Sequence, residues 1–140
     1  MNHPPVSRRA LLRDAFRTAL AGLLATPSAR RAIAAPRFAK DPFSLGVASG
    51  FPASDSVVLW TRLAPEPQAA DGGMAAAPVE VRWEVSEDDR FTRIVRHGVS
   101  HATPERAHAV HVEVEGLAPS RWYWYRFHAG HATSPYGRTL

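Results

Sequence analysis

Apolar and polar residues alternate at every second position in the back half of the chain, and this period constrains the fold more than any other feature. In residues 79–85, three valines and a tryptophan alternate with Glu80, Arg82 and Glu84, and residues 110–115 and 123–128 repeat the alternation. A strand directs successive side chains to opposite faces, whereas a helix would space its apolar positions about three to four residues apart. These segments are therefore predicted to be strands with one buried and one solvated face.

Shorter candidate strands lie at residues 44–48, 56–63, 93–97 and 133–139. About seven strands in roughly a hundred residues, separated by turn residues, are typical of an immunoglobulin-like or fibronectin type III-like β-sandwich. The longest connection, residues 64–78, is rich in Ala, Pro and Gly and is predicted to be a mobile loop. The sequence thus predicts an all-β fold with a single core, because 140 residues leave room for one ordinary domain and a short appendage.

Four aromatic residues are candidates for this core. The spacing Leu-x-Pro-x-x-x-Tyr that ends at Tyr123 is similar to the start of the sixth strand of fibronectin type III domains, where the tyrosine hydroxyl bonds back to nearby backbone. Trp60 stands where such domains have a core tryptophan on the second strand. The alternative is that Trp60 is exposed and serves as a platform for a ligand. Trp83 and Tyr125 complete the expected core set.

The net charge of +4 belongs to the front of the chain. Residues 1–35 hold six arginines and one aspartate, so the remainder is close to neutral. A near-neutral domain has no basic stripe to follow a phosphate backbone, and no nucleic-acid partner is predicted. The chain has no cysteine, which excludes a disulfide framework.

The front segment resembles a twin-arginine export signal, through Ser7, Arg8, Arg9, Leu11 and Leu12. The apolar run at residues 18–25 is too short for a permanent membrane span and is typical of the hydrophobic part of a signal peptide. The alternative is an amphipathic helix over residues 8–25 that packs on the domain or lies on a membrane surface.

A small-residue pattern then predicts signal cleavage, at Ala32, Ala34 and Ala35, with the cut after Ala34 or Ala35. The expected organisation is a twin-arginine signal peptide at 1–35, a linker at 36–42 and a sandwich domain at 43–140. This arrangement predicts export by the twin-arginine machinery to a periplasmic or extracellular location.

Residue types that carry chemistry occur without a recognisable site. The histidines of the back half show no metal-ligand spacing with Asp or Glu and are expected at solvated positions: His97, His101, His108, His111, His128 and His131. The acidic run 87–89 favours a solvated turn over a calcium loop, and no Gly-x-Ser-x-Gly elbow is present. No catalytic, cofactor-binding or metal-binding residue is predicted.

Trp122 and Trp124 alternate with Tyr123 and Tyr125, so they are expected on the opposite face of the same strand. Two large exposed aromatics on a monomer indicate a partner surface. Docking against a neighbouring domain is the favoured interpretation. Sugar binding, or cover by other segments of the same domain, are the alternatives.

Several segments together resemble the beginning of the alkaline phosphatase D family, over nearly all of residues 43–139. They are residues 43–50 (FSLGVASG), 55–63 (DSVVLWTRL), 79–86, 111–114 and 122–127. The resemblance implies a secreted phosphomonoesterase or phosphodiesterase, in which a fibronectin-like domain precedes a calcineurin-like metallophosphatase domain with iron and calcium. The catalytic ligands would lie in that second domain, so the chain is expected to be truncated before it.

One residue departs from the family pattern. Phe51 follows Ser49-Gly50 where the family usually has Asp, and a phenylalanine cannot cap a turn through its side chain. The leading hypothesis is a non-catalytic N-terminal module that packs on the phosphatase domain and shapes or shields its active-site entrance. An autonomous exported module that binds a carbohydrate or a protein is the alternative.

Overall fold

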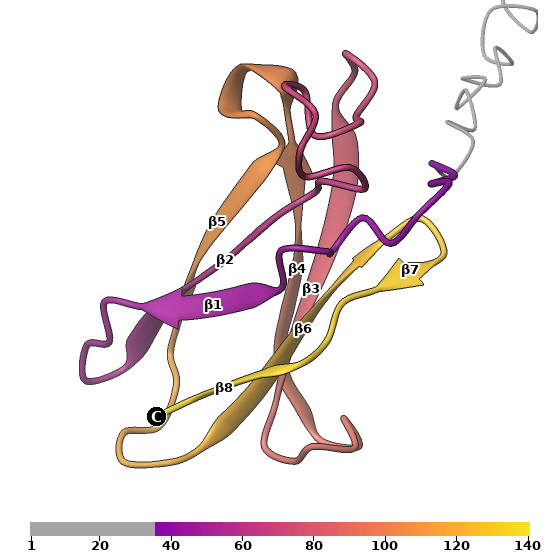
Figure 1. Cartoon of the computed structure of the whole chain (residues 1–140). Helices are drawn as coiled ribbons and strands as arrows, with labels where there is room; N and C mark the ends of the chain where they lie inside the picture. Colours follow the sequence, from indigo (N-terminus) through magenta and orange to yellow (C-terminus); the bar gives the residue numbers. More distant parts are fainter. Residues whose placement is uncertain (1–35) are drawn as a thin grey trace, which may run out of the picture. The chain divides into compact units, whose positions relative to one another are not determined.

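Two antiparallel sheets pack face to face in residues 36–140, the part of the chain that this computed structural model describes (Figure 1). One sheet has the order β1-β2-β5, formed by β1 (Val47–Gly50), β2 (Ser56–Arg62) and β5 (Ala109–Glu115). The other sheet is built around β6, and its strands are β3 (Val79–Ser86), β4 (Ile94–Ala102), β6 (Tyr123–Ala129), β7 (Ala132–Thr133) and β8 (Gly137–Thr139). A short 3-10 helix, Pro104–Arg106, precedes β5.

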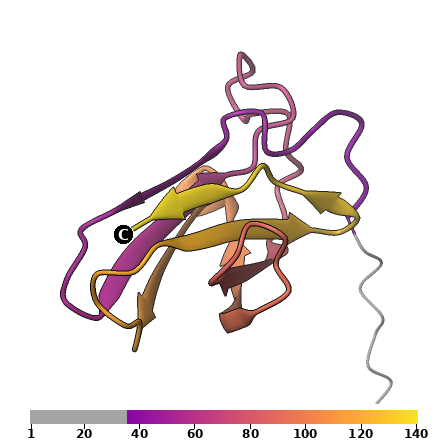
Figure 2. The same ribbon diagram turned by 90° about the horizontal axis from the view of Figure 1, so that it is seen from below.

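In the five-stranded sheet, β6 pairs with β3 on one side and with β7 and β8 on the other, and β4 lies outside β3. Viewed from below, the two sheets form two layers (Figure 2). This arrangement confirms the predicted all-β sandwich. No helix within residues 36–140 has the length and apolarity needed to cross a membrane.

The inner faces of the two sheets share one core, as the period of two predicts. Val57 lies opposite Val114 and Leu59 opposite Val112 in one sheet, and the other sheet contributes Val81, Val85, Tyr123, Tyr125 and Phe127. Full burial of a large apolar side chain is worth about 1.5–3 kcal/mol, so these alternating positions supply most of the driving force for folding.

The turn before β6 has the geometry that its sequence predicts. The hydroxyl of Tyr123 accepts a hydrogen bond from the backbone N–H of Ala118 at 2.9 Å, and the tyrosine ring is buried. The N–H of Leu117 donates to the carbonyl of Asp55 at 2.9 Å, which ties this corner to the β1–β2 turn. Both contacts set the position at which β6 begins.

Trp60 does not belong to the core, and the prediction that it does is wrong. Its side chain is 40% exposed on the outer face of the three-stranded sheet, where it stacks on His111 with 6.2 Å between ring centroids. Val57, Leu59 and Thr61 occupy the inner positions of β2 instead, so the alternation directs Trp60 outward.

Two strand boundaries also differ from expectation. β1 begins only at Val47, because a turn precedes it, closed by the Gly46 N–H donating to the Phe43 carbonyl at 2.7 Å. The segment expected as one strand at 133–139 is split into β7 and β8. At the break, the Phe127 N–H donates to the side-chain hydroxyl of Ser134 at 2.9 Å instead of to a backbone carbonyl. The next residue, Pro135, has no N–H to donate to the sheet.

The segments outside the strands pack closely as well. Within residues 64–78, which composition predicts to be a mobile loop, the Glu66 N–H donates to the Gly72 carbonyl at 2.8 Å and Met74 is buried in the core. In the segment expected as a linker, residues 36–42, Phe38 packs against the core and Pro42 is buried.

Gly98 of β4 makes room for Trp83, its cross-strand neighbour on β3. A Cβ added to Gly98 would lie 2.5 Å from Cζ2 and 2.8 Å from Cε2 of the Trp83 indole, closer than non-bonded carbons approach. The half-buried indole of Trp83 therefore packs directly on the backbone of Gly98 at the edge of the core.

We expect Gly98→Ala to lower the free energy of unfolding by about 1–3 kcal/mol, because the indole must move to admit a methyl group. Urea denaturation measures the change. Gly50→Ala is the matched control in another strand, since no atom lies within 4 Å of a Cβ at Gly50. Equal stability of the two variants would contradict the packing role of Gly98.

Candidate functional site: the outer aromatic face of the five-stranded sheet

The outer side of β6 carries a group of partly exposed aromatic and charged side chains. Trp124, Arg126 and His128 alternate with the buried residues of β6, and Arg138 of β8 lies opposite Trp124. Trp122, just before the strand, is 45% exposed, and the Arg138 guanidinium lies 4.2 Å above its ring. We call this surface the outer aromatic face, and it comprises Glu84, Phe91, Trp122, Trp124, Arg126, His128, Tyr136 and Arg138.

An ion pair crosses the centre of this face. Arg126 lies opposite Glu84 of β3, and its Nε and Nη2 are both 2.9 Å from Glu84 Oε2. His128 Nε2 lies 3.3 Å from the same oxygen without hydrogen-bond alignment, and His128 Nδ1 lies 3.0 Å from Thr133 Oγ1. Burial raises the pKa of Glu84, but Arg126 and His128 outweigh this effect and hold that pKa below its usual value.

Aromatic rings continue the face beyond the ion pair. The Arg126 guanidinium lies 4.0 Å from the centroid of the Phe91 ring, a cation–π distance. Phe91 in turn meets Tyr136 edge to face, with 6.5 Å between centroids, and Tyr136 is 58% exposed. Arg126 is therefore held between a carboxylate and an aromatic ring.

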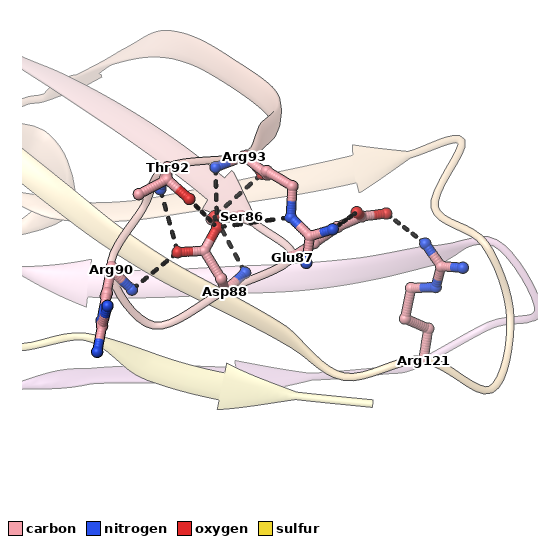
Figure 3. Close-up of polar contacts among 7 residues, drawn as sticks. All are labelled: Ser86, Glu87, Asp88, Arg90, Thr92, Arg93 and Arg121. Carbon is pink, nitrogen blue, oxygen red and sulfur yellow. Dashed lines mark hydrogen bonds and ion pairs between the residues drawn. The ribbon is translucent and has the colours of Figure 1, made fainter.

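Asp88 closes the β3–β4 loop, as Figure 3 shows. The Phe91 N–H donates to the Asp88 carbonyl at 3.2 Å. Oδ1 of Asp88 accepts from the N–H groups of Arg90 (3.0 Å) and Thr92 (3.1 Å). Oδ2 accepts from the Arg93 N–H (2.8 Å), the Thr92 hydroxyl (3.0 Å) and the Ser86 hydroxyl (3.2 Å). Within this loop Phe91 has φ +57°, a left-handed conformation that a bulky residue keeps only when its surroundings impose it.

These contacts also decide what the acidic run 87–89 can do. The Asp88 carboxylate is occupied by donors from its own loop, and Glu87 forms ion pairs with Arg93 (3.8 Å) and Arg121. The run closes a turn and joins it to the corner before β6. Hydrogen bonds, first that from the Thr92 N–H, outweigh the raising effect of burial and lower the pKa of Asp88 from 3.8 to about 2.

We expect Asp88→Asn to flatten the acid dependence of stability. A carboxyl whose pKa is depressed in the folded state contributes stability that is present above pH 3.8 and is lost as the pH falls through about 2. Urea midpoints measured from pH 2 to pH 5 should diverge between the wild type and Asp88→Asn as the pH rises. Asp89→Asn, at an exposed neighbour, serves as the control, and parallel profiles for wild type and Asp88→Asn would refute the role of this carboxylate.

The two tryptophans proposed from sequence as an interface both lie on the outer aromatic face, with Trp122 exposed and Trp124 partly buried. Sequence reasoning missed Glu84, Phe91, Tyr136 and Arg138. The alternation of β6 was the available signal for Arg126 and His128. The other members come from different strands and loops, and only the pairing register brings them together.

The six histidines in residues 36–140 lie in different strands and turns. His108 is buried with φ +56°, so the prediction of a solvated position is wrong for this residue, because it lies in the tight turn before β5 rather than on a strand face. His111 stacks on Trp60. Across residues 36–140, no three side chains of His, Asp or Glu come together in a way that could hold a metal ion.

The export motif, Ser7, Arg8, Arg9, Leu11 and Leu12, lies outside the described residues. The expected cleavage positions, Ala32, Ala34 and Ala35, lie outside them too.

Comparison with known proteins decides the family. The model of the PhoD-like phosphatase N-terminal domain matches residues 27–140. The chain belongs to this family. It is 58% identical over 106 residues to alkaline phosphatase D of Bacillus subtilis (strain 168), a match that covers 76% of this chain and 18% of that protein.

A solved structure of PhoD is also similar to this PhoD-like domain, with a TM-score of 0.72 and 57% sequence identity over 74% of the chain and 20% of that structure. The family resemblance carried by residues 43–139 is thereby confirmed. The chain spans less than a fifth of the length of the B. subtilis relative.

Proposed function

We propose that residues 43–140 act as the non-catalytic N-terminal module of an alkaline phosphatase D-like metallophosphatase, and that the module docks on the catalytic domain through the outer aromatic face. The match to the N-terminal domain of PhoD-like phosphatases carries the proposal. The relative is much longer than the matched segment, which supports a catalytic domain that lies outside this match. By this docking the module shapes or shields the entrance of the active site.

The chemistry of the outer aromatic face suits docking better than catalysis. Its one carboxylate–imidazole pair, Glu84 with His128, is already engaged by Arg126, so it offers no free ligand set for a metal. The iron and calcium that the family resemblance implies would therefore be held by the catalytic domain and not by these residues. The proposed activity is that of a phosphomonoesterase or phosphodiesterase.

Burial of the face would be favoured by its exposed aromatic surface and by the ion pair that Arg126 already forms. The exposed 45% of Trp122 would contribute on the order of 1 kcal/mol if it were covered. Arg126 keeps Glu84 and Phe91 as partners when water is excluded, so its charge is not buried unpaired.

This proposal is tested with a chimera in which residues 36–140 replace the matched segment of B. subtilis alkaline phosphatase D. We expect Trp122→Ser to lower the temperature at which the chimera loses phosphate-ester hydrolysis. Trp60→Ser, which truncates an exposed tryptophan on the other sheet, should leave that temperature unchanged. The unmodified 140-residue chain should show no turnover with iron and calcium added.

Metal-dependent turnover by the chain alone, or equal effects of the two tryptophan variants, would overturn the proposal. The second candidate function, an autonomous binding module, is favoured by the exposed Trp122 ring beside Arg138, since an aromatic ring with polar neighbours can receive a sugar. Saturable quenching of tryptophan fluorescence by a carbohydrate, lost in Trp122→Ser, would support that candidate instead.

We also propose that residues 1–35 direct export through the twin-arginine pathway to the periplasm or beyond, on the strength of the Arg8-Arg9 motif. Fused to a folded reporter, this segment should carry the reporter out of the cytoplasm. Replacing Arg8 and Arg9 by Lys should abolish export, because the pathway reads the arginine pair, whereas replacing Arg30 and Arg31 by Lys should not. Export of the Arg8/Arg9 variant would contradict the assignment.

A further inference from the structure

The outer face of the three-stranded sheet carries a large aromatic side chain, Trp60, that the proposed function does not use. Strand β2 directs Val57, Leu59 and Thr61 into the core and Trp60 to the outside, where the indole is 40% exposed. An exposed indole keeps in contact with water an apolar surface that a bound ligand would cover. Trp60 is therefore a candidate contact for a ligand on this sheet.

The neighbours of Trp60 differ on its two sides. On the β5 side, His111 lies directly opposite and its ring stacks on the indole, with 21° between the ring planes. On the β1 side, Ala48 lies directly opposite, and Gly50 follows two residues later on the same face of that strand. A Cβ added to Gly50 would have no other atom within 4 Å. The indole is thus backed by a second ring on one side, and its cross-strand neighbours on the other side are small. We call these four residues the Trp60 platform.

Two charged side chains lie at the edges of the Trp60 platform. Arg62 follows Trp60 by two residues on the outer face of β2, and its Nε donates to the Ala107 carbonyl at 2.9 Å, which fixes the guanidinium. Glu113 follows His111 by two residues on the outer face of β5 and is exposed. A guanidinium donates hydrogen bonds, a carboxylate accepts them, and an imidazole can do both. An apolar ring is therefore bordered by donors and an acceptor.

This combination of groups favours one class of ligand. A stable protein interface covers about 800 Å² on each partner around several apolar anchors, whereas Trp60 and His111 are the only aromatic rings within β1, β2 and β5 of the described chain. A purely anionic ligand would meet Glu113, and a purely cationic one would meet Arg62. A neutral sugar ring matches better, because one of its faces is formed by C–H groups and its edge carries hydroxyls that both donate and accept.

We propose that the Trp60 platform binds the ring of a neutral sugar, whose C–H face stacks on the indole and whose hydroxyls bond to Arg62 and Glu113. The small side chains of Ala48 and Gly50 leave room for this ring beside the indole. The site lies on the other sheet from the outer aromatic face and is independent of the proposed docking.

NMR titration of the 140-residue chain tests the proposal, with cellotriose, mannotriose and chitotriose as probes. We expect at least one trisaccharide to shift the indole Nε1–H signal of Trp60 in a saturable way, with a Kd on the order of 1 mM, as is reasonable for a small ligand on an open surface. The signals of Trp122 and Trp124 should not move. Sorbitol is the control ligand, because it has similar hydroxyls but no rigid C–H face, and it should give no saturable shift.

Two variants locate the site, with binding followed through the backbone amide of His111. Trp60→Ala should weaken binding at least about tenfold, because the stacking surface is removed. Ala48→Leu should weaken binding by a similar factor while keeping the indole, because the larger side chain fills the space beside it. The matched controls on the other sheet, Trp122→Ala and Val99→Leu, should leave the Kd unchanged.

The outcomes separate this site from the proposed docking. If no trisaccharide shifts the Trp60 signal, the sugar site is refuted and docking through the outer aromatic face is untouched. A shift of the Trp122 signal instead would refute it too and would support the binding-module candidate. The chimera should bind the sugar with the same Kd as the chain. Loss of binding in the chimera, or a Trp60 signal that moves with protein concentration alone, would mean that the catalytic domain or a second copy covers the platform, and would overturn the proposal.

Discussion

Strand β6 is the element on which the rest of the structure depends, because each of its faces requires a different environment. Tyr125 and Phe127 fill the core, while Trp124 and Arg126 face outward. A slip of one residue would bring a guanidinium into the core and three aromatic rings, including that of Tyr123, into water, at a cost of several kcal/mol. The register of β6 is therefore fixed both by the apolar residues on its inner face and by the polar residues on its outer face.

Two side chains secure that register at the ends of the strand. The Tyr123 hydroxyl binds the corner before the strand, and the Ser134 hydroxyl accepts from the Phe127 N–H near its end. Between them, the ion pair of Arg126 with Glu84 joins β6 to β3. Asp88 closes the β3–β4 loop with hydrogen bonds, and this loop carries Phe91. The loop thereby places the Phe91 ring beside Arg126 on the outer aromatic face.

The strands that alternate cleanly could be predicted from sequence, and with them the core tyrosines and the hydrogen bond at Tyr123. The outward position of Trp60 could not be predicted, because β2 has large apolar residues on both faces and the local pattern does not say which face is buried. Phe91, Tyr136 and Arg138 come from a loop, a connection and an edge strand. Only long-range strand pairing brings these residues close to β6, and the spacing of residues in the sequence does not predict that pairing.

The split of the last strand has a mechanical consequence. Because Ser134 and Pro135 interrupt the pairing, β8 is held to β6 over only three residues, Gly137–Thr139. In the proposed two-domain protein, that short strand would also be the tether to the catalytic domain. Tension between the two domains would peel β8 away before any other strand, removing Arg138 from the Trp122 ring and uncovering Tyr125, whose ring packs against Gly137. Relative motion of the domains would therefore first loosen the surface through which the module is proposed to dock.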